Sequence, residues 1–199
     1  YDIIQNQKDR LFCITADVAG KSIHACIVMV MIRSLLYLIT NTAQSTQSIL
    51  DILNKGITGK ISIDHYASIS LLTYFPAEQT IEYVNAGRQS LLLWKNRTKK
   101  LLRLEQKSDP IGIDSKSVYT AKKIPVEKGD IAVLFTDGIV ETLNERGAAF
   151  GLKALAELLA DHANLPAREI TKKINQQIKA FIGKTTPHDD QTVMIIKVK

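Results

Sequence analysis

The chain has 199 residues, of which 45% are hydrophobic and 23% charged. That length and composition can bury one sizeable core, and they exclude a disordered or fibrous chain. The formal net charge is +6, but the Lys and Arg residues are scattered without interleaved aromatic side chains. We therefore expect no nucleic-acid binding.

The first part of the chain is predicted to form a β-hairpin followed by a long apolar helix. Tyr1–Gln7 and Leu11–Ala16 are strand-like and are separated by a turn. Asp17–Ser22 is a polar turn in which Gly20 permits backbone dihedrals that other residues rarely adopt. The helix that follows, Ile23–Ile39, is apolar almost all round, which predicts burial between layers of structure.

That helix is also the one candidate membrane span in the sequence. A span needs about 20 mainly apolar residues with few charges, and Arg33 interrupts this one, so we predict a core helix and no membrane span. Cys13 and Cys26 both lie in apolar runs, which favours buried free thiols in a reducing cytoplasm over a disulfide. The chain begins at Tyr1 without Met or a signal peptide, and we expect an N-terminally truncated fragment of a longer protein.

The middle of the chain is predicted to be β-structure and the last third mainly helical. A short amphipathic helix, Ser48–Lys55, ends at Gly56. The predicted strands that follow are Tyr66–Phe75, Thr80–Val84, Ser90–Lys95, Leu101–Leu104, Val118–Ile124 and Asp130–Thr136. The predicted last elements are helices Phe150–Ala163 and Arg168–Ile182 and a strand Thr192–Val198. Because the links between strands are short, the pairing should be antiparallel, which favours an α+β layered sandwich.

Carboxylates follow or precede several of the apolar strands. Asp17, Asp137 and the pair Asp189 and Asp190 occupy such positions. Mg²⁺ and Mn²⁺ prefer carboxylate, carbonyl and water oxygens, so these residues are candidate ligands. Taken singly, each Asp is more often a turn or helix cap. The histidines show no ligand spacing, and zinc is not expected; they are His24, His65, His162 and His188.

A phosphate-binding P-loop is a second interpretation of the first turn. Ala19–Ser22, with the letters AGKS, follows a strand and precedes a helix. The full P-loop pattern, however, needs glycine where Thr15 stands, and Asp17 would bring negative charge to an anion site. The sequence therefore disfavours a nucleotide triphosphatase.

Five segments, in order, resemble the motifs of one family. The stretch ADVAGKSIHACIVMVMIRSLL is similar to the GDVSGKGxxAAxxM signature of the SpoIIE/RsbU-type serine phosphatases, a bacterial branch of the protein phosphatase 2C-like (PPM) family. The other four matching segments are IEYVNAGRQSLLLW, SDPIGI, IAVLFTDGIVETLNERGAAFG and HDDQTVMIIKV. Together they are distributed along almost the whole chain.

The resemblance implies a fold and a metal centre. The fold would be a four-layer αββα sandwich of two mainly antiparallel sheets flanked by helices, spanning residues 1–199 as one phosphatase domain. The centre would hold two Mn²⁺ or Mg²⁺ ions. By the resemblance, Asp17 would bridge the ions, the Val18 carbonyl would bind one, and Asp137 with Asp189 and the adjacent Asp190 would bind the other.

The resemblance also implies an activity and a partner. A metal-bridging water would hydrolyse phosphoserine or phosphothreonine on a regulatory protein, here a STAS-type anti-sigma-factor antagonist. The domain would be the cytoplasmic C-terminal output part of a longer sensor protein, and a homodimer is left open. The alternative is a phosphatase-like module that binds a partner with little or no turnover.

The sequence departs from the family pattern at several positions. The family's first metal-binding Asp precedes the chain, which starts at Tyr1-Asp2, so we expect weak binding of the second metal and low activity in this fragment. Ser22 replaces a glycine, Ala16 replaces another before Asp17, and Arg88 stands where His is typical.

Overall fold

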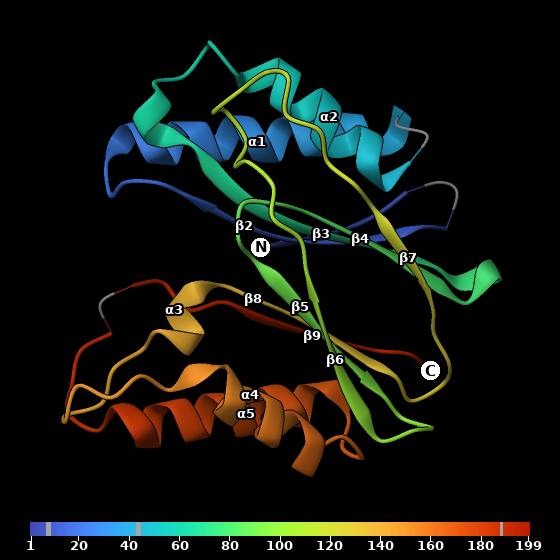
Figure 1. The fold of residues 1–199 in the computed structure, drawn as a ribbon, viewed down its shortest axis with the longest axis vertical. Helices are drawn as coiled ribbons and strands as arrows, with labels where there is room; N and C mark the ends of the chain where they lie inside the picture. Colours follow the sequence, from blue (N-terminus) through green and yellow to red (C-terminus); the bar gives the residue numbers. More distant parts are fainter. Residues whose placement is uncertain (7–8, 43–44, 188) are drawn as a thin grey trace. The chain divides into compact units, whose positions relative to one another are not determined.

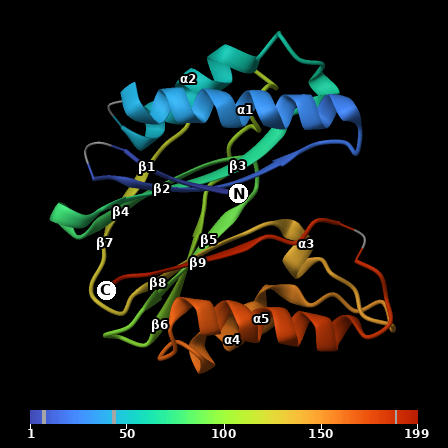
Figure 2. The ribbon, with the colours of Figure 1, turned by 180° about the vertical axis from the view of Figure 1, so that it is seen from behind.

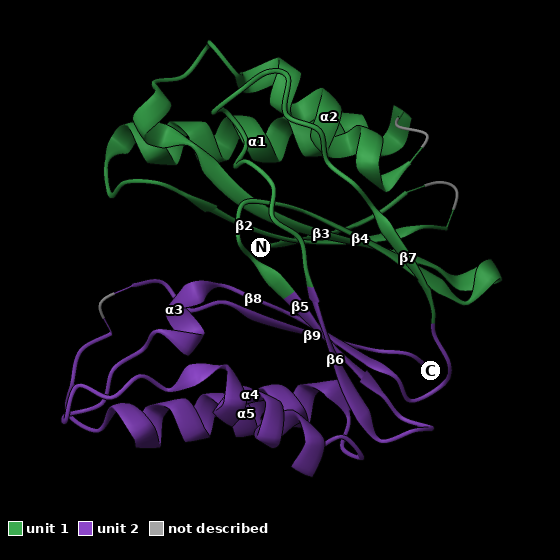
Figure 3. Cartoon of the chain, viewed as in Figure 1, with its two compact units in different colours: residues 1–90, 105–125 green, residues 91–104, 126–199 purple. Residues whose placement is uncertain are grey.

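The computed structural model describes residues 1–6, 9–42, 45–187 and 189–199 (Figure 1). These residues form two antiparallel sheets with helices packed on them, so the expected α+β fold class is confirmed. The chain divides into two compact units (Figure 3). Unit 1 comprises Tyr1–Ser90 and Glu105–Pro125, and unit 2 comprises Leu91–Leu104 and Val126–Lys199.

Unit 1 contains a five-stranded sheet in the order β1-β2-β3-β4-β7, with every neighbouring pair antiparallel. Its strands are β1 (Asp2–Gln5), β2 (Leu11–Val18), β3 (Ala67–Phe75), β4 (Thr80–Ala86) and β7 (Lys122–Pro125). Helices α1 (Ile23–Thr42) and α2 (Thr46–Ile57) cover one face of this sheet (Figures 1 and 2). Two short 3-10 helices, Ile63–His65 and Pro76–Glu78, flank β3.

Unit 2 contains a four-stranded sheet in the order β6-β5-β8-β9. Its strands are β5 (Ser90–Lys95), β6 (Lys100–Glu105), β8 (Ile131–Phe135) and β9 (Val193–Lys197). A four-residue helix α3 (Asp137–Val140) follows β8 directly, and α4 (Gly151–Asp161) and α5 (Ala167–Ile182) lie on one face of the sheet (Figure 1).

Each unit has its own hydrophobic core, built from the alternation and periodicity of its elements. In β2, Phe12, Ile14 and Val18 point toward the helices and join a core with α1 and α2. In unit 2, Ile174 and Ile178 of α5 are four residues apart and therefore share the face that packs into the second core. All five residues of β8 are buried.

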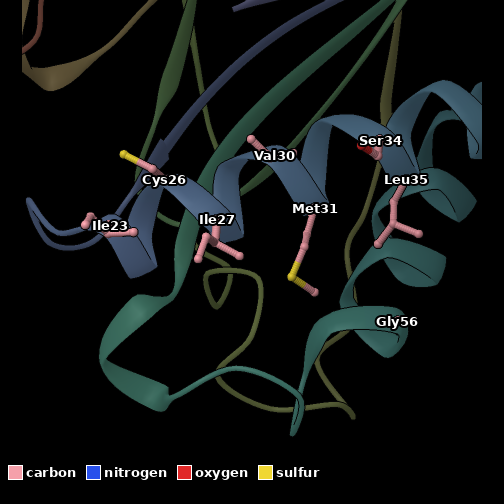
Figure 4. A pocket seen from close by; sticks show the side chains of 8 residues that line it. All are labelled: Ile23, Cys26, Ile27, Val30, Met31, Ser34, Leu35 and Gly56. Carbon is pink, nitrogen blue, oxygen red and sulfur yellow. The ribbon is translucent and has the colours of Figure 1, made fainter.

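Helix α1 differs from the prediction. It was expected to be buried between layers, but only one of its faces is: Val28 and Ile32 are buried, whereas Val30 is 63% and Leu38 68% exposed. Its outer side contributes most of the lining of an apolar groove that reaches Gly56 of α2 (Figure 4). Among the described helices α1 alone is long and apolar enough to cross a membrane, a criterion that core helices of soluble proteins also meet.

The predicted burial of the cysteines and several predicted element boundaries also differ from the structure. Cys13 is buried as expected, but Cys26 lies on the exposed side of α1; both are free. Strand β2 continues through Asp17 and Val18, which were predicted to lie in a turn, because these residues pair with Ser68 and Ala67 of β3.

Helix α2 and strand β7 also have bounds that differ from the predicted ones. Helix α2 does not end at Gly56 but at Ile57, and it starts earlier than expected because Ser45 accepts a capping hydrogen bond from the Ser48 amide. Strand β7 covers only the end of the predicted Val118–Ile124. Gln7 of the first predicted strand and His188 lie outside the described residues.

Candidate functional site

Asp17 lies near the end of β2, on the face of the sheet opposite helices α1 and α2. Phe12, Ile14 and Val18 face the helices, so the alternation of a strand places Asp17 on the other face, beside Thr15. Thr15 is buried, whereas Asp17 is exposed and Val18 is buried. The pairing of Asp17 with Ser68 fixes its backbone in the ladder rather than in a loop.

The chain leaves β2 through a turn that stays close to β3. The Ala19 amide donates to the Tyr66 carbonyl over 2.8 Å. Gly20 then adopts a positive φ of 97°, which a glycine tolerates and most residues do not. Two histidines that were not predicted to lie together meet beside this turn: the rings of His24 and His65 are 5.7 Å apart.

The end of β4 packs against the residue that pairs with Asp17. A Cβ added to Gly87 would meet the Ser68 Oγ at 2.6 Å, so only glycine allows this close approach. Asn85 holds the turn: its Nδ2 donates to the Gly87 carbonyl at 2.8 Å and to the Gln106 carbonyl at 3.0 Å. The NAG letters of the sequence were quoted only for their family resemblance; their structural role depends on partners distant in the sequence.

The carboxylates of unit 2 are positioned by a second glycine contact. Asp137 is the first residue of α3, directly after β8 and Thr136. A Cβ added to the buried Gly138 would meet the Asp190 carbonyl oxygen at 2.1 Å and the Asp189 Cβ at 3.6 Å. The segment that carries Asp189 and Asp190 therefore lies against the start of α3, beside Asp137.

Hydrogen bonds from Thr136 fix that segment. The Thr136 amide donates to the Thr192 carbonyl, and the Thr192 amide donates to Thr136 Oγ1, both at 3.0 Å. Thr136 Oγ1 in turn donates to the Asp190 carbonyl at 3.3 Å. One step further along, Gln191 Nε2 donates to Thr142 Oγ1 at 2.6 Å. The structure thus joins the two acidic segments of unit 2, which are some fifty residues apart in the sequence.

The candidate residues of unit 2 have the chemistry to bind a hard cation. Asp137, Asp189 and Asp190 are exposed, and they offer carboxylate and carbonyl oxygens, the donors that Mg²⁺ and Mn²⁺ prefer. No group of three or more His, Cys, Asp or Glu side chains gathers as a ligand set among the residues that the structure describes. Asp17 and Val18 belong to unit 1, and the other candidate ligands belong to unit 2. That the two groups bind metal ions together therefore remains a prediction.

Cysteine chemistry has no support at this site. Cys13 lies on β2, and burial raises the pKa of its thiol to about 12. The thiol therefore stays protonated near neutral pH, and a protonated thiol is not a nucleophile.

Comparison with known proteins decides the family. A family model described as Stage II sporulation protein E (SpoIIE) matches residues 7–199. The chain belongs to the SpoIIE family. The phosphoserine phosphatase RsbU of Bacillus subtilis is 26% identical over 96% of the chain and 57% of its own length. The chain spans about half the length of the curated relatives that it matches.

Solved structures share the fold of this SpoIIE-family chain. The SiaA-PP2C domain of Pseudomonas aeruginosa matches with a TM-score of 0.82 and 19% identity, over 97% of this chain and 78% of that domain. The RsbU and RsbW domains of Rv1364c from Mycobacterium tuberculosis match with a TM-score of 0.76 and 21% identity, over 98% of this chain and 53% of theirs. The PP2C-like fold and the antiparallel sheets overturn the P-loop interpretation, which needs a parallel β-α unit.

Proposed function

We propose that the chain is a metal-dependent protein serine/threonine phosphatase. The observation that carries the proposal is the junction of Asp137 with the Asp189–Asp190 segment, made by the Gly138 contact and the Thr136 hydrogen bonds. Aspartate side chains offer only oxygen donors, which suit Mg²⁺ or Mn²⁺ better than zinc. Membership of the SpoIIE family, with phosphoserine phosphatases among its relatives, supports the proposal.

Residues of both units would bind the cations. Asp17 and the Val18 carbonyl would supply ligands from unit 1, and Asp137, Asp189 and Asp190 would supply them from unit 2. When bound, two divalent cations activate water near neutral pH and neutralise phosphoryl charge. Thr136 and Gly138 position the backbone of the segment that carries Asp189 and Asp190. No side chain of the protein is required as a nucleophile.

The proposed substrate is a phosphoserine or phosphothreonine on a cytoplasmic regulatory protein, and a STAS-type antagonist is the specific candidate. Two relatives named as phosphoserine phosphatases, RsbU and RsbP, support this substrate class.

The test is hydrolysis of p-nitrophenyl phosphate and of a phosphoserine peptide by the 199-residue chain with Mn²⁺. We expect a low but measurable Mn²⁺-dependent rate that EDTA abolishes and that Asp17→Asn or Asp137→Asn lowers by about 100-fold or more, because each removes a charged group next to the reacting phosphate. Asp161→Asn is the matched control, since Asp161 is an exposed residue at the end of α4, and it should retain the full rate.

A second measurement separates catalysis from binding. Calorimetric titration should show Mn²⁺ binding that Asp137→Asn weakens and Asp161→Asn does not. If the chain binds Mn²⁺ but hydrolyses neither substrate above the rate of the Asp variants, the enzyme proposal fails and a partner-binding module is the better description.

A further inference from the structure

Arg88 is an isolated exposed residue in a buried stretch. In residues 83–94, all of which the structure describes, every residue is buried except Arg88. It lies in the turn between β4 and β5. A guanidinium is always charged, so exposure of its head is expected. The unusual feature is that the backbone on both sides of Arg88 is tightly held.

The residues before Arg88 are fixed by a buried asparagine. Asn85 is 1% exposed, and its Nδ2 donates to two backbone carbonyls, those of Gly87 and Gln106. Ser108 Oγ donates to the Asn85 carbonyl at 2.8 Å, and the Gly87 amide donates to the Ser108 carbonyl at 3.2 Å. Four hydrogen bonds therefore determine the path of the chain into Arg88.

The residue after Arg88 is fixed as well. Gln89 is 4% exposed, and Thr15 Oγ1 donates to its Oε1 at 3.4 Å. Tyr83 donates its hydroxyl proton to the Gln89 carbonyl at 3.1 Å. Burial raises the pKa of Tyr83 to about 12, against a smaller lowering by its hydrogen bond with Ser70, so this donor stays protonated. Arg88 thus extends from a backbone that is held in place before a ligand binds, and only the ordering of its own side chain opposes binding.

The turn also places Arg88 at the Asp17 end of the sheet. Asp17 pairs with Ser68, and Gly87 packs directly on Ser68. Neighbouring strands lie about 4.8 Å apart, so Gly87 is roughly 10 Å from Asp17, two strand spacings away. An arginine side chain one residue further on can reach the space beside the Asp17 carboxylate.

We propose that Arg88 binds the phosphoryl group of the substrate, as a residue that determines specificity for phosphate at the Asp17 end of unit 1. The inference rests on the proposed phosphatase function and adds the group that recognises the phosphate dianion. A guanidinium matches two phosphoryl oxygens with two parallel N–H donors, which a lysine cannot do. The sequence alone marked Arg88 only as a departure from the histidine typical of the family.

The test compares Arg88→Gln and Arg88→Lys with the unchanged chain. The readouts are kcat and KM for a phosphoserine peptide and competitive inhibition by inorganic phosphate. Loss of a hydrogen-bonded charge predicts that Arg88→Gln weakens phosphate inhibition and lowers kcat/KM about 10- to 100-fold. Arg88→Lys should recover only part of the loss, because it restores the charge but not the bidentate geometry.

The control is Arg168→Gln, an exposed arginine in the first turn of α5. It should match the unchanged chain in both readouts. Mn²⁺ affinity and melting temperature should be equal in all variants, since Arg88 is neither buried nor proposed as a metal ligand.

Two results would overturn the inference. If Arg88→Gln and Arg168→Gln behave alike while Asp17→Asn loses activity, Arg88 is a solvated surface charge and the phosphatase proposal stands. If the unchanged chain shows no metal-dependent hydrolysis, the phosphatase proposal fails. Titration of inorganic phosphate into the Mn²⁺-loaded chain and the Arg88→Gln variant then decides whether Arg88 binds phosphate, and equal affinities would rule it out.

Discussion

The two units hold their candidate carboxylates in different ways. In unit 1, Asp17 is part of a strand, and the ladder with β3 fixes its backbone whatever the neighbouring side chains are. In unit 2, Asp137 begins a four-residue helix and Asp189 lies in a segment without regular structure. There the position depends on one glycine contact and a few hydrogen bonds made by Thr136. Substitutions near the carboxylates should therefore affect unit 2 far more than unit 1.

The largest expected effect is that of Gly138→Ala. A new Cβ would lie 2.1 Å from the Asp190 carbonyl oxygen, so the two acidic segments must separate. Overpacking of this kind costs about 1–3 kcal/mol of stability, and a displacement of about 1 Å at a reacting site can lower the rate about 100-fold. Thermal unfolding and p-nitrophenyl phosphate hydrolysis measure the two effects.

The control for Gly138→Ala is Gly56→Ala in α2. Gly56 has an ordinary helical backbone, and its added Cβ would meet only Leu35 Cδ1 at 3.8 Å. Alanine should stabilise the helix there by about 0.5–1 kcal/mol. Full activity in Gly138→Ala would mean that the contact between the acidic segments has no part in the site.

The next effect in size is that of Thr136→Val, which keeps the shape of the side chain and removes Oγ1. The Thr192 amide then loses its acceptor and the Asp190 carbonyl loses a donor. We expect a loss of about 1–3 kcal/mol in the free energy of unfolding. The apparent Mn²⁺ affinity should fall as well, and a titration checks this. Unchanged affinity would show that Gly138 alone positions the segment.

The smallest effect should come from Ser68→Ala, next to Asp17 in unit 1. The backbone ladder between β2 and β3 remains, so Asp17 keeps its position. A substitution that leaves the ladder intact should change stability by less than about 1 kcal/mol and activity by less than about threefold. A large loss of activity with unchanged unfolding would contradict the comparison, because it would mean that the Ser68 hydroxyl itself contacts the reacting groups.

Helices and strands could be predicted where the hydrophobic pattern and the length of a segment indicated the same kind of element. Strand β5 has the predicted bounds, and α5, with isoleucines four residues apart, begins one residue early. Helix α1 was placed correctly, but its burial was not, because a helix that is apolar on every side gives no periodic signal for the face that packs.

The candidate site was predictable only in part. The carboxylates were chosen as candidates from their positions at strand ends together with the family resemblance, and their role stays a prediction. Asp17 was assigned to a turn because the ladder with β3 depends on residues about fifty positions away. The roles of Asn85 and Thr136 were missed for the same reason, since their partners are Gln106 and Asp190. Helix α3 is too short to show any periodicity.

The interleaved course of the chain through its two units has a consequence for biosynthesis. Strand β5 lies between β6, which follows it directly in the chain, and β8, which lies beyond the last segment of unit 1. During synthesis on the ribosome, the apolar stretch LLLW of β5 therefore emerges well before Ile131–Phe135 of β8, with which it pairs. Pairings that span such sequence distances form slowly and leave hydrophobic strands open to aggregation. We therefore expect this protein to be most prone to aggregation after β5 has been synthesised and before β8 has.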